Sequence, residues 1–411
     1  MKASNDPTVE FRSARASMNV MTRVCIVGVF AVVLAAGGAP DAQRRGGAPP
    51  PGPGGPGRGA RATAGTVERI TVHGKALEGN LEGDSPDREV TVYLPPSYAT
   101  DQNRRFPVVY LLHGFGERDG MFTNEFVRLQ ESANRLAAAQ GFSEQIVVMP
   151  NAFTLHKGSM YSNSVTTGDW ERFIADDLVG YIDSHYRTLA HRMSRGLAGH
   201  SMGGYGALRI GMKRPEVFAS LYSMSACCLT ANRGRPDATD RSRDPQPEWT
   251  AAAAVITTRA QAEEAARAPG FGASVILGWA AAWSPNPKNP PLFLDLPVRD
   301  GKDHPDIIAK WVANAPLEMV EQYAANLNAY YAIAMDVGTA DGLLGSNRQL
   351  HAAMTKLRIP HAYEEYDGDH TNRVRERIES SLLPFFARNL AAPANLTSPS
   401  AAADRLSTAS R

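Results

Sequence analysis

The chain has 411 residues, of which 43% are hydrophobic and 21% are charged, and its formal net charge at pH 7 is +1. This composition is that of a globular protein with a large core, and the length allows one large domain or two smaller ones. The balanced charge, with no basic stripe interleaved with aromatic residues, excludes the electrostatic footprint of a nucleic-acid-binding protein.

The N-terminal region has the layout of a secretory signal. Residues 18–23 form a short basic start, residues 24–39 are uncharged and mostly apolar, and this run ends in small residues. The run is short for a membrane span, which needs about 20 apolar residues, and no cysteine follows it that could carry a lipid. We therefore expect residues 1–42 to be a signal region, with Met18 as an alternative start, and the protein to be periplasmic or secreted without a stable membrane anchor.

Two further segments are expected to be disordered. Residues 43–65 are rich in Pro, Gly, Ala and Arg, and residues 391–411 are rich in Ala, Ser, Pro and Thr. Neither segment carries enough apolar surface to offset the entropy that it would lose on ordering. The folded domain is therefore expected over residues 66–390.

Strands and helices alternate along this domain. Apolar and polar residues alternate over 67–72 and 88–94, as in half-exposed strands, whereas 106–112 and 145–149 are near-continuous apolar runs, as in strands buried on both faces. Further strands are predicted at 195–200, 217–224, 332–337 and 361–366, and helices at 170–185, 202–213, 317–328, 346–357 and 372–387. The alternation predicts an α/β fold with a mainly parallel central sheet flanked by helices.

One stretch, residues 229–315, interrupts the alternation. It combines Pro-, Asp- and Arg-rich pieces with an Ala-rich helix near 251–267 and with Trp279, Trp283 and Trp311. We interpret it as a cap-like insertion that covers the active site. The alternative is a helical elaboration that packs on the side of the sheet.

A serine flanked by glycines follows a predicted strand directly. The segment Gly199-His200-Ser201-Met202-Gly203 has the pattern G-x-S-x-G and precedes a predicted helix. On a sharp strand-to-helix turn such a serine points its Oγ out of the fold, and the glycines allow close backbone approach without Cβ clashes. Ser201 is therefore the candidate nucleophile, although the pattern by itself is weak because chance matches are common.

A serine nucleophile needs a base, and the base needs an acid that orients it. The α/β-hydrolase arrangement places the acid and then the histidine later in the chain, each in a loop after a strand. Asp341 and His370 each follow one of the last two predicted strands. Asp336 competes with Asp341, but it lies at the end of its strand, where a structural role is expected. The predicted triad is Ser201, Asp341 and His370.

The negative charge that develops on a reacting carbonyl oxygen needs two hydrogen-bond donors. One is expected from the backbone N–H of Met202, where the dipole of the following helix adds to the attraction. The other is expected from the N–H of Phe115, in the turn that follows an early buried strand. His113 lies inside the same turn, so we expect it to be structural and not a catalytic base.

Trp170 and His200 are candidates for lining the substrate site, with a core position as the alternative for Trp170. Cys227 and Cys228 are adjacent. They either form a vicinal disulfide in an oxidising compartment or are small buried side chains. No metal-binding motif and no glycine-rich phosphate loop is present, so neither a metal nor a cofactor is expected.

Several segments resemble the esterase family of α/β-hydrolases. They are Tyr110–Gly114, Gly168–Phe173, Tyr181–Tyr186, Gly196–Gly206, Gly338–Asp341 and Gly368–His370. The family includes esterase D (S-formylglutathione hydrolase), feruloyl esterases, enterochelin esterases and mycolyltransferases. The resemblance covers about residues 65–390, with no clear match for the insertion. It implies an α/β-hydrolase fold, metal-free serine chemistry on carboxylic esters and a Ser201/Asp341/His370 triad, and it supports Phe115 and Met202 as oxyanion donors.

We expect an exported serine carboxylesterase that forms an acyl-enzyme on Ser201 and acts on a small-molecule or carbohydrate-linked ester. The secretory layout argues against the cytosolic formylglutathione activity. Two alternatives stay open: transfer of the acyl group to a sugar or alcohol, which the same triad would serve, and a non-catalytic carbohydrate-binding or scaffold protein on the same fold. Aryl esters of plant cell-wall sugars, acetylated sugars and short-chain esters are all compatible with the sequence, and the oligomeric state is open.

Overall fold

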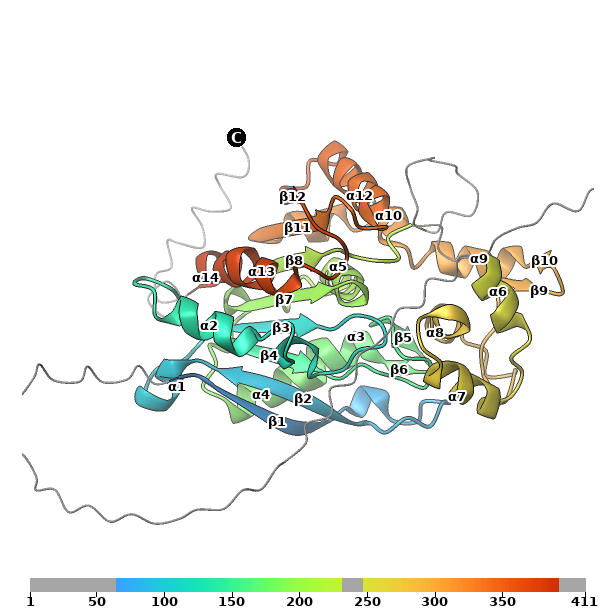
Figure 1. Ribbon diagram of the computed structural model, residues 1–411, viewed down its shortest axis with the longest axis horizontal. Coiled ribbons are helices and arrows are strands. Elements are labelled where there is room, and N and C mark those ends of the chain that lie inside the picture. Colours follow the sequence, from blue (N-terminus) through green and yellow to red (C-terminus); the bar gives the residue numbers. More distant parts are fainter. Residues whose placement is uncertain (1–63, 231–246, 392–411) are drawn as a thin grey trace, which may run out of the picture. The chain divides into compact units, whose positions relative to one another are not determined.

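The computed structural model describes residues 64–230 and 247–391 (Figure 1). The expected signal region (1–42), nearly all of the linker (43–65) and all of the tail (391–411) except Ala391 lie outside the described residues, so they stay predictions. Within the described ranges, no helix combines the length and the apolar character that crossing a membrane requires.

An eight-stranded sheet forms the centre of the domain, in the order β1-β2-β4-β3-β7-β8-β11-β12 (Figure 1). The strands are β1 (Thr66–His73), β2 (Asp87–Leu94), β3 (Val108–Leu112), β4 (Ile146–Pro150), β7 (Arg195–His200), β8 (Ser220–Met224), β11 (Ala332–Gly338) and β12 (Ala362–Tyr366). The β1–β2 and β2–β4 pairs are antiparallel and the other neighbours are parallel. The predicted α/β class with a mainly parallel sheet is confirmed.

Both faces of the sheet are covered by helices. In β3, Tyr110 and Leu112 belong to one hydrophobic cluster and Val109 and Leu111 to the other, which is the period-two alternation of a strand. The helices of the first cluster include α3 (Trp170–Arg172), the π-helical η3 (Phe173–Leu178), α4 (Val179–His185), α5 (Met202–Lys213) and α12 (Leu344–Lys356). Those of the second are α2 (Leu129–Ala137), α13 (Val374–Arg377), the π-helical η5 (Ile378–Leu382) and α14 (Leu383–Asn389).

Shorter elements connect these layers. They are η1 (Lys75–Leu77), α1 (Pro96–Thr100), η2 (Met121–Thr123), η4 (Arg192–Ser194), α10 (Pro316–Met319), α11 (Ala324–Asn328) and the strand pair β5 (Asn163–Ser164) and β6 (Gly168–Asp169). The helix predicted over 317–328 is thus two short helices with a turn between them.

The single helix predicted near 251–267 is wrong. The structure has two helices there, α6 (Pro247–Ala254) and α7 (Arg259–Arg267). The break has a local cause, because the Thr258 side chain accepts the N–H of Gln261 and the Gln261 side chain accepts the N–H of Thr258. This reciprocal capping box starts a new helix and satisfies two of its unpaired N–H groups.

The insertion also contains α8 (Gly272–Trp283), α9 (Pro305–Val312) and the strand pair β9 (Val298–Arg299) and β10 (Lys302–Asp303). Its core is a cluster of Trp279, Trp283 and Trp311, whose ring centroids lie 5.3 to 5.7 Å apart. Tyr205 of α5 packs against Trp283 and donates a 2.9 Å hydrogen bond to the carbonyl of Asn314. The insertion therefore packs against Tyr205 in the first turn of the helix that follows Ser201.

A buried ion pair ties the C-terminal helices to the sheet. Asp336 of β11 is fully buried and accepts hydrogen bonds from Arg377 Nε at 2.9 Å and from the Tyr222 hydroxyl at 2.6 Å. Burial raises the pKa of Asp336 to about 6, because Arg377 and Tyr222 offset the desolvation of the carboxylate only in part. Asp336 thus has the structural role expected for it.

Loss of one partner from this pair should be costly. Arg377→Met leaves the Asp336 carboxyl buried without its cation, so the free energy of unfolding should fall by about 3 to 5 kcal/mol. Denaturant unfolding measures the change. Arg375→Met, which removes an exposed pair with Glu131, is the control and should cost about 1 kcal/mol or less. Equal losses in the two variants would contradict the role of the buried pair.

Candidate active site

Ser201 occupies the sharp turn between β7 and α5, with φ 58° and ψ −116°. Its own backbone is held on both sides, because its N–H donates to Met224 O at 3.0 Å and its carbonyl accepts the N–H groups of Tyr205 and Cys227. A Cβ on Gly199 would collide with the backbone of Gly203, and a Cβ on Gly203 would collide with the carbonyl of Leu112. The two glycines are therefore needed for the close approach that exposes the serine hydroxyl.

The structure brings the three predicted triad residues together. His370 Nε2 lies 3.0 Å from Ser201 Oγ, and His370 Nδ1 lies 2.9 Å from Asp341 Oδ2. Asp341 follows β11 and His370 follows β12, and these strands are parallel neighbours, so both loops leave the same edge of the sheet. The loops are tied to each other by hydrogen bonds, among them the N–H of Ala340 to the carbonyl of Gly368 at 2.9 Å.

The Asp341 side chain is almost completely buried but remains a carboxylate. Burial by itself would raise its pKa, but the hydrogen bond and charge of His370, the N–H of Leu343 and the hydroxyl of Ser225 outweigh this, so the pKa lies below its usual value. A carboxylate only accepts hydrogen bonds, so His370 Nδ1 carries the proton. His370 Nε2 is then free to accept the proton of Ser201. The contact from Ser225 was not predicted, because a serine at a strand end carries no distinguishing sequence signal.

The structure places the two predicted oxyanion donors, Phe115 and Met202, close to each other. Both side chains pack against Gly158, where an added Cβ would lie 2.7 Å from the Phe115 ring and 2.6 Å from Met202 Sδ. An added Cβ on Gly114 would lie 3.5 Å from Ser201 Cβ. The turn after β3 therefore lies directly beside the nucleophile. Among the described residues, no acceptor takes the N–H of Phe115 or of Met202.

His113 is a structural residue in this turn. It is fully buried, its Nδ1 donates to Gly114 O at 2.8 Å, and its Nε2 accepts the N–H of Ala152 at 2.8 Å. Burial lowers its pKa to about 4, so the ring is neutral at pH 7. It joins the turn after β3 to the segment after β4.

His200 is a support for His370 and is too deeply buried to line the substrate site as predicted. It is 3% exposed, its ring packs at a tilt against the ring of His370 with centroids 4.7 Å apart, and its Nε2 donates to the carbonyl of His370 at 2.7 Å. Burial lowers the pKa of His200 to about 3, so the ring is neutral. Its sequence position next to Ser201 indicated that His200 belongs to the site. The sequence did not indicate that His200 contacts His370.

Trp170 lies in the hydrophobic core, which corrects its candidate place in the substrate site. Its side chain is 1% exposed and its indole N–H donates to Thr167 O at 2.8 Å. Its ring packs edge-on against Phe173, and the guanidinium of Arg88 lies over it. These neighbours leave it no surface for a substrate.

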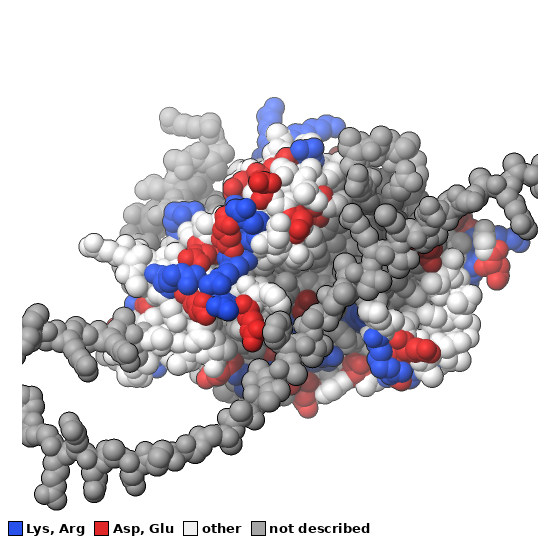
Figure 2. Space-filling model, in the orientation of Figure 1, with Lys and Arg blue, Asp and Glu red and all other residues white. Residues whose placement is uncertain are grey.

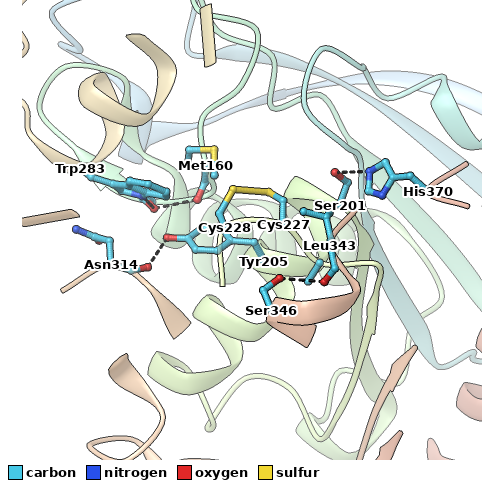
Figure 3. Close-up of a disulfide and its surroundings, with 12 residues drawn as sticks. Met160, Ser201, Tyr205, Cys227, Cys228, Trp283, Asn314, Leu343, Ser346 and His370 are labelled. Atoms are coloured by element: carbon cyan, nitrogen blue, oxygen red, sulfur yellow. Dashed lines mark hydrogen bonds between the residues drawn. A yellow bond between two sulfur atoms is a disulfide. The ribbon is translucent and has the colours of Figure 1, made fainter. Parts of the chain in front are cut away.

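Cys227 and Cys228 form a vicinal disulfide close to Ser201 (Figure 3). The two cysteines lie on the chain segment after β8. The N–H of Cys227 donates to the carbonyl of Ser201 at 3.2 Å, so this segment lies next to Ser201. In Figure 3 the disulfide is drawn with Ser201 on one side and the side chain of Tyr205 on the other. Within the described part of the chain, no group of three or more His, Cys, Asp or Glu side chains is arranged to hold a metal ion.

The charged side chains drawn in Figure 2 are of mixed sign on the visible face, with blue and red groups adjacent to one another. Ion pairs such as Arg135 with Glu379 and Arg375 with Glu131 also join charges of opposite sign. The described side chains visible in Figure 2 therefore form no single-sign patch of the kind that binds a polyanion.

A family model described as "Putative esterase" matches residues 85–374 of the chain. An esterase of Mycobacterium tuberculosis, Rv1288, is 37% identical over 140 residues, which are 33% of this chain and 28% of that protein. A protein of Xylanibacter ruminicola named endo-1,4-beta-xylanase/feruloyl esterase is 30% identical over 155 residues, which are 36% of this chain and 21% of that protein. The alignments thus span less than a third of the length of either relative.

Solved structures share the fold. A ferulic acid esterase superimposes with a TM-score of 0.56 at 24% identity, covering 79% of this chain and 99% of that one. The S-formylglutathione hydrolase of Agrobacterium tumefaciens has a TM-score of 0.52 at 17% identity, covering 81% and 98%. These similarities show that the fold is that of the α/β-hydrolases.

The support that His200 gives to His370 can be tested on the reactivity of Ser201. His200→Leu removes the donor to the His370 carbonyl, so the rate at which a fluorophosphonate probe labels Ser201 should fall about tenfold. His200→Gln keeps an N–H donor and should retain more of the rate.

The pH dependence of Ser201 labelling shows whether His200 only holds His370 in place or changes charge itself. Because the pKa of His200 is about 3, its ring does not change charge between pH 5 and 8, and both variants should lose reactivity on the acid side at the same pH as the wild type. A shift of that acid limb in His200→Leu would show that His200 itself titrates in the working range.

Proposed function

This chain belongs to the esterase family of serine hydrolases that act on carboxylic ester bonds, and from that premise we propose that Ser201 is the nucleophile of an acyl-enzyme mechanism. The observation that carries the proposal is the continuous line of hydrogen bonds from Ser201 Oγ through His370 to Asp341, with donor–acceptor distances of 3.0 and 2.9 Å. Nucleophile and base within such reach, with the base oriented by a third group, are the requirement for activating a serine hydroxyl.

The first half of the reaction forms the acyl-enzyme. Ser201 Oγ attacks the ester carbonyl carbon while His370 Nε2 takes the hydroxyl proton, and the carbonyl oxygen becomes an oxyanion held by the N–H groups of Phe115 and Met202. The intermediate collapses as His370 returns the proton to the leaving alkoxy oxygen, which departs as an alcohol. In the second half, a water gives its proton to His370 and attacks the acyl carbon, releasing a carboxylic acid and restoring Ser201.

Asp341 stabilises the imidazolium that forms twice in each cycle. Its low pKa keeps it anionic, so it holds the His370 ring in the reactive tautomer and offsets the positive charge. His200, neutral and hydrogen-bonded to the carbonyl of His370, holds the main chain of His370 without adding charge.

We place the substrate among small-molecule or carbohydrate-linked carboxylic esters and the protein outside the cytoplasm. The name of the Xylanibacter ruminicola relative includes feruloyl esterase activity, which supports an ester of this class. The basic start followed by an uncharged apolar run at residues 18–39 supports export. A fractionation experiment on the full chain would contradict export if the mature protein stayed in the cytoplasm.

Removal of the nucleophile tests the mechanism. Ser201→Ala should lower kcat for hydrolysis of a p-nitrophenyl ester by about 10³-fold or more, because no other group replaces the serine. The control is Ser184→Ala, which removes an exposed hydroxyl on α4 and should leave kcat unchanged. Turnover by Ser201→Ala at the wild-type rate would rule out the assignment.

Two further measurements decide between the alternatives. With sugar or alcohol acceptors added, product analysis should show the free acid as the main product, and a dominant acylated acceptor would instead identify a transferase. A fluorophosphonate probe should label Ser201, and its failure to do so would favour a non-catalytic protein on the same fold.

A further inference from the structure

The segment after β4 joins the insertion to the proposed oxyanion hole, and Lys157 is the residue that contacts both. Lys157 is 9% exposed and has a left-handed backbone, with φ 71°. Such a conformation is uncommon for a residue with a Cβ and persists where the surroundings hold it. Here both the side chain and the main chain of the residue are held.

The side chain of Lys157 holds the end of α7. Its Nζ donates to Ala268 O at 2.7 Å and to Gly270 O at 2.9 Å, in the connection between α7 and α8. Carbonyl groups at the C-terminal end of a helix lack partners and carry the negative end of its dipole, so they are suited to an ammonium group. Among the described residues, no carboxylate lies within ion-pair distance of Lys157, so these carbonyls are its compensation.

The main chain of Lys157 holds the turn after β3. Its carbonyl accepts the N–H of Gly116 at 2.9 Å, and Gly116 directly follows Phe115. This hydrogen bond fixes the peptide on the C-terminal side of Phe115. The N–H of Phe115 can point at a developing oxyanion only if the peptides on both sides of Phe115 are held in place.

The insertion also contacts Phe115 directly. An added Cβ on Gly278 of α8 would lie 3.2 Å from the Phe115 ring and 3.2 Å from the carbonyl of His156, next to Lys157. The ring of Phe271, which precedes α8, packs edge-on against Phe115 with centroids 6.0 Å apart. The α7–α8 region and the turn after β3 therefore form one packed unit with Lys157 at its centre.

We propose that Lys157 is a positioning residue that couples the insertion to the oxyanion hole. By holding α7 and α8 against Phe115 while its carbonyl holds Gly116, it makes the placement of the Phe115 N–H depend on the docked position of the insertion. The insertion thus contributes to the geometry of the catalytic machinery. This inference rests on the proposed function, because it assigns a cause to the geometry of one proposed oxyanion donor.

The test removes the ammonium group of Lys157 and keeps an unbranched apolar side chain in its place. Lys157→Met should lower kcat for a p-nitrophenyl ester by about 10- to 100-fold, because displacement of one donor by about 1 Å weakens the transition state more than the bound ester. KM should change less than about threefold, since a small ester makes few contacts with the insertion. Lys310→Met, which removes an exposed ammonium on α9 of the same insertion, is the matched control and should leave both constants unchanged.

Two further variants keep the test valid if Lys157→Met folds poorly. Lys157→Arg retains a cation that can donate to the same carbonyls and should recover most of the lost kcat. Phe271→Ala removes a half-exposed ring on the insertion side and should lower kcat in the same direction with an unchanged melting temperature. Limited proteolysis should cut Lys157→Met faster than the wild type between Ala268 and Phe271.

The outcomes separate the two proposals. If the wild type has Ser201-dependent turnover and Lys157→Met keeps the wild-type kcat although the α7–α8 connection is cut faster, the coupling is wrong and the proposed function stands. If KM rises while kcat is unchanged, Lys157 acts on binding and the coupling is also wrong. If the wild type has no Ser201-dependent turnover, the proposed function fails and the coupling fails with it.

Discussion

The site depends on one close approach of backbone to backbone. The first turn of α5 lies so near to the ends of β3 and β7 that a Cβ on Gly199 would collide with Gly203 and a Cβ on Gly203 would collide with Leu112. Ser201 stands at the centre of this contact in a conformation that a residue with a Cβ rarely adopts. Its N–H donates to the carbonyl of Met224, and its carbonyl accepts the N–H groups of Tyr205 and Cys227. Exposure of the nucleophile is thus a consequence of packing at the centre of the sheet.

The parallel sheet then determines where the partners of Ser201 lie. Successive parallel strands end at the same edge, so the loops after β3, β7, β11 and β12 meet there although they are far apart in sequence. His370 and Asp341 arrive from two such loops, and Phe115 from a third. Smaller contacts refine this placement: His200 holds the main chain of His370, His113 joins the turn after β3 to the segment after β4, and Lys157 joins that segment to the insertion.

The α/β class, most strands and the order of the triad could be predicted from the sequence, because these depend on local patterns. Buried strands such as β3 are continuous apolar runs, and each candidate site residue follows a strand. Contacts between distant segments could not be predicted in this way. The burial of Trp170, the ring contact of His200 with His370 and the hydrogen bonds of Lys157 to two segments depend on tertiary packing, which sequence periodicity does not reveal. The break between α6 and α7 could have been predicted in part, since the Thr258-x-x-Gln261 capping box is visible in the sequence.

The most direct measurement of the central claim is the mass of the serine-containing peptide after reaction with an acyl donor. Wild-type protein mixed with p-nitrophenyl acetate, quenched in acid within the first turnover and digested, should carry one acetyl group on the peptide that contains Ser201, and the acetyl group should disappear when the quench is delayed until the ester is consumed. Rapid ester hydrolysis with an unmodified Ser201 peptide, or with the acetyl group on another residue, would contradict the account.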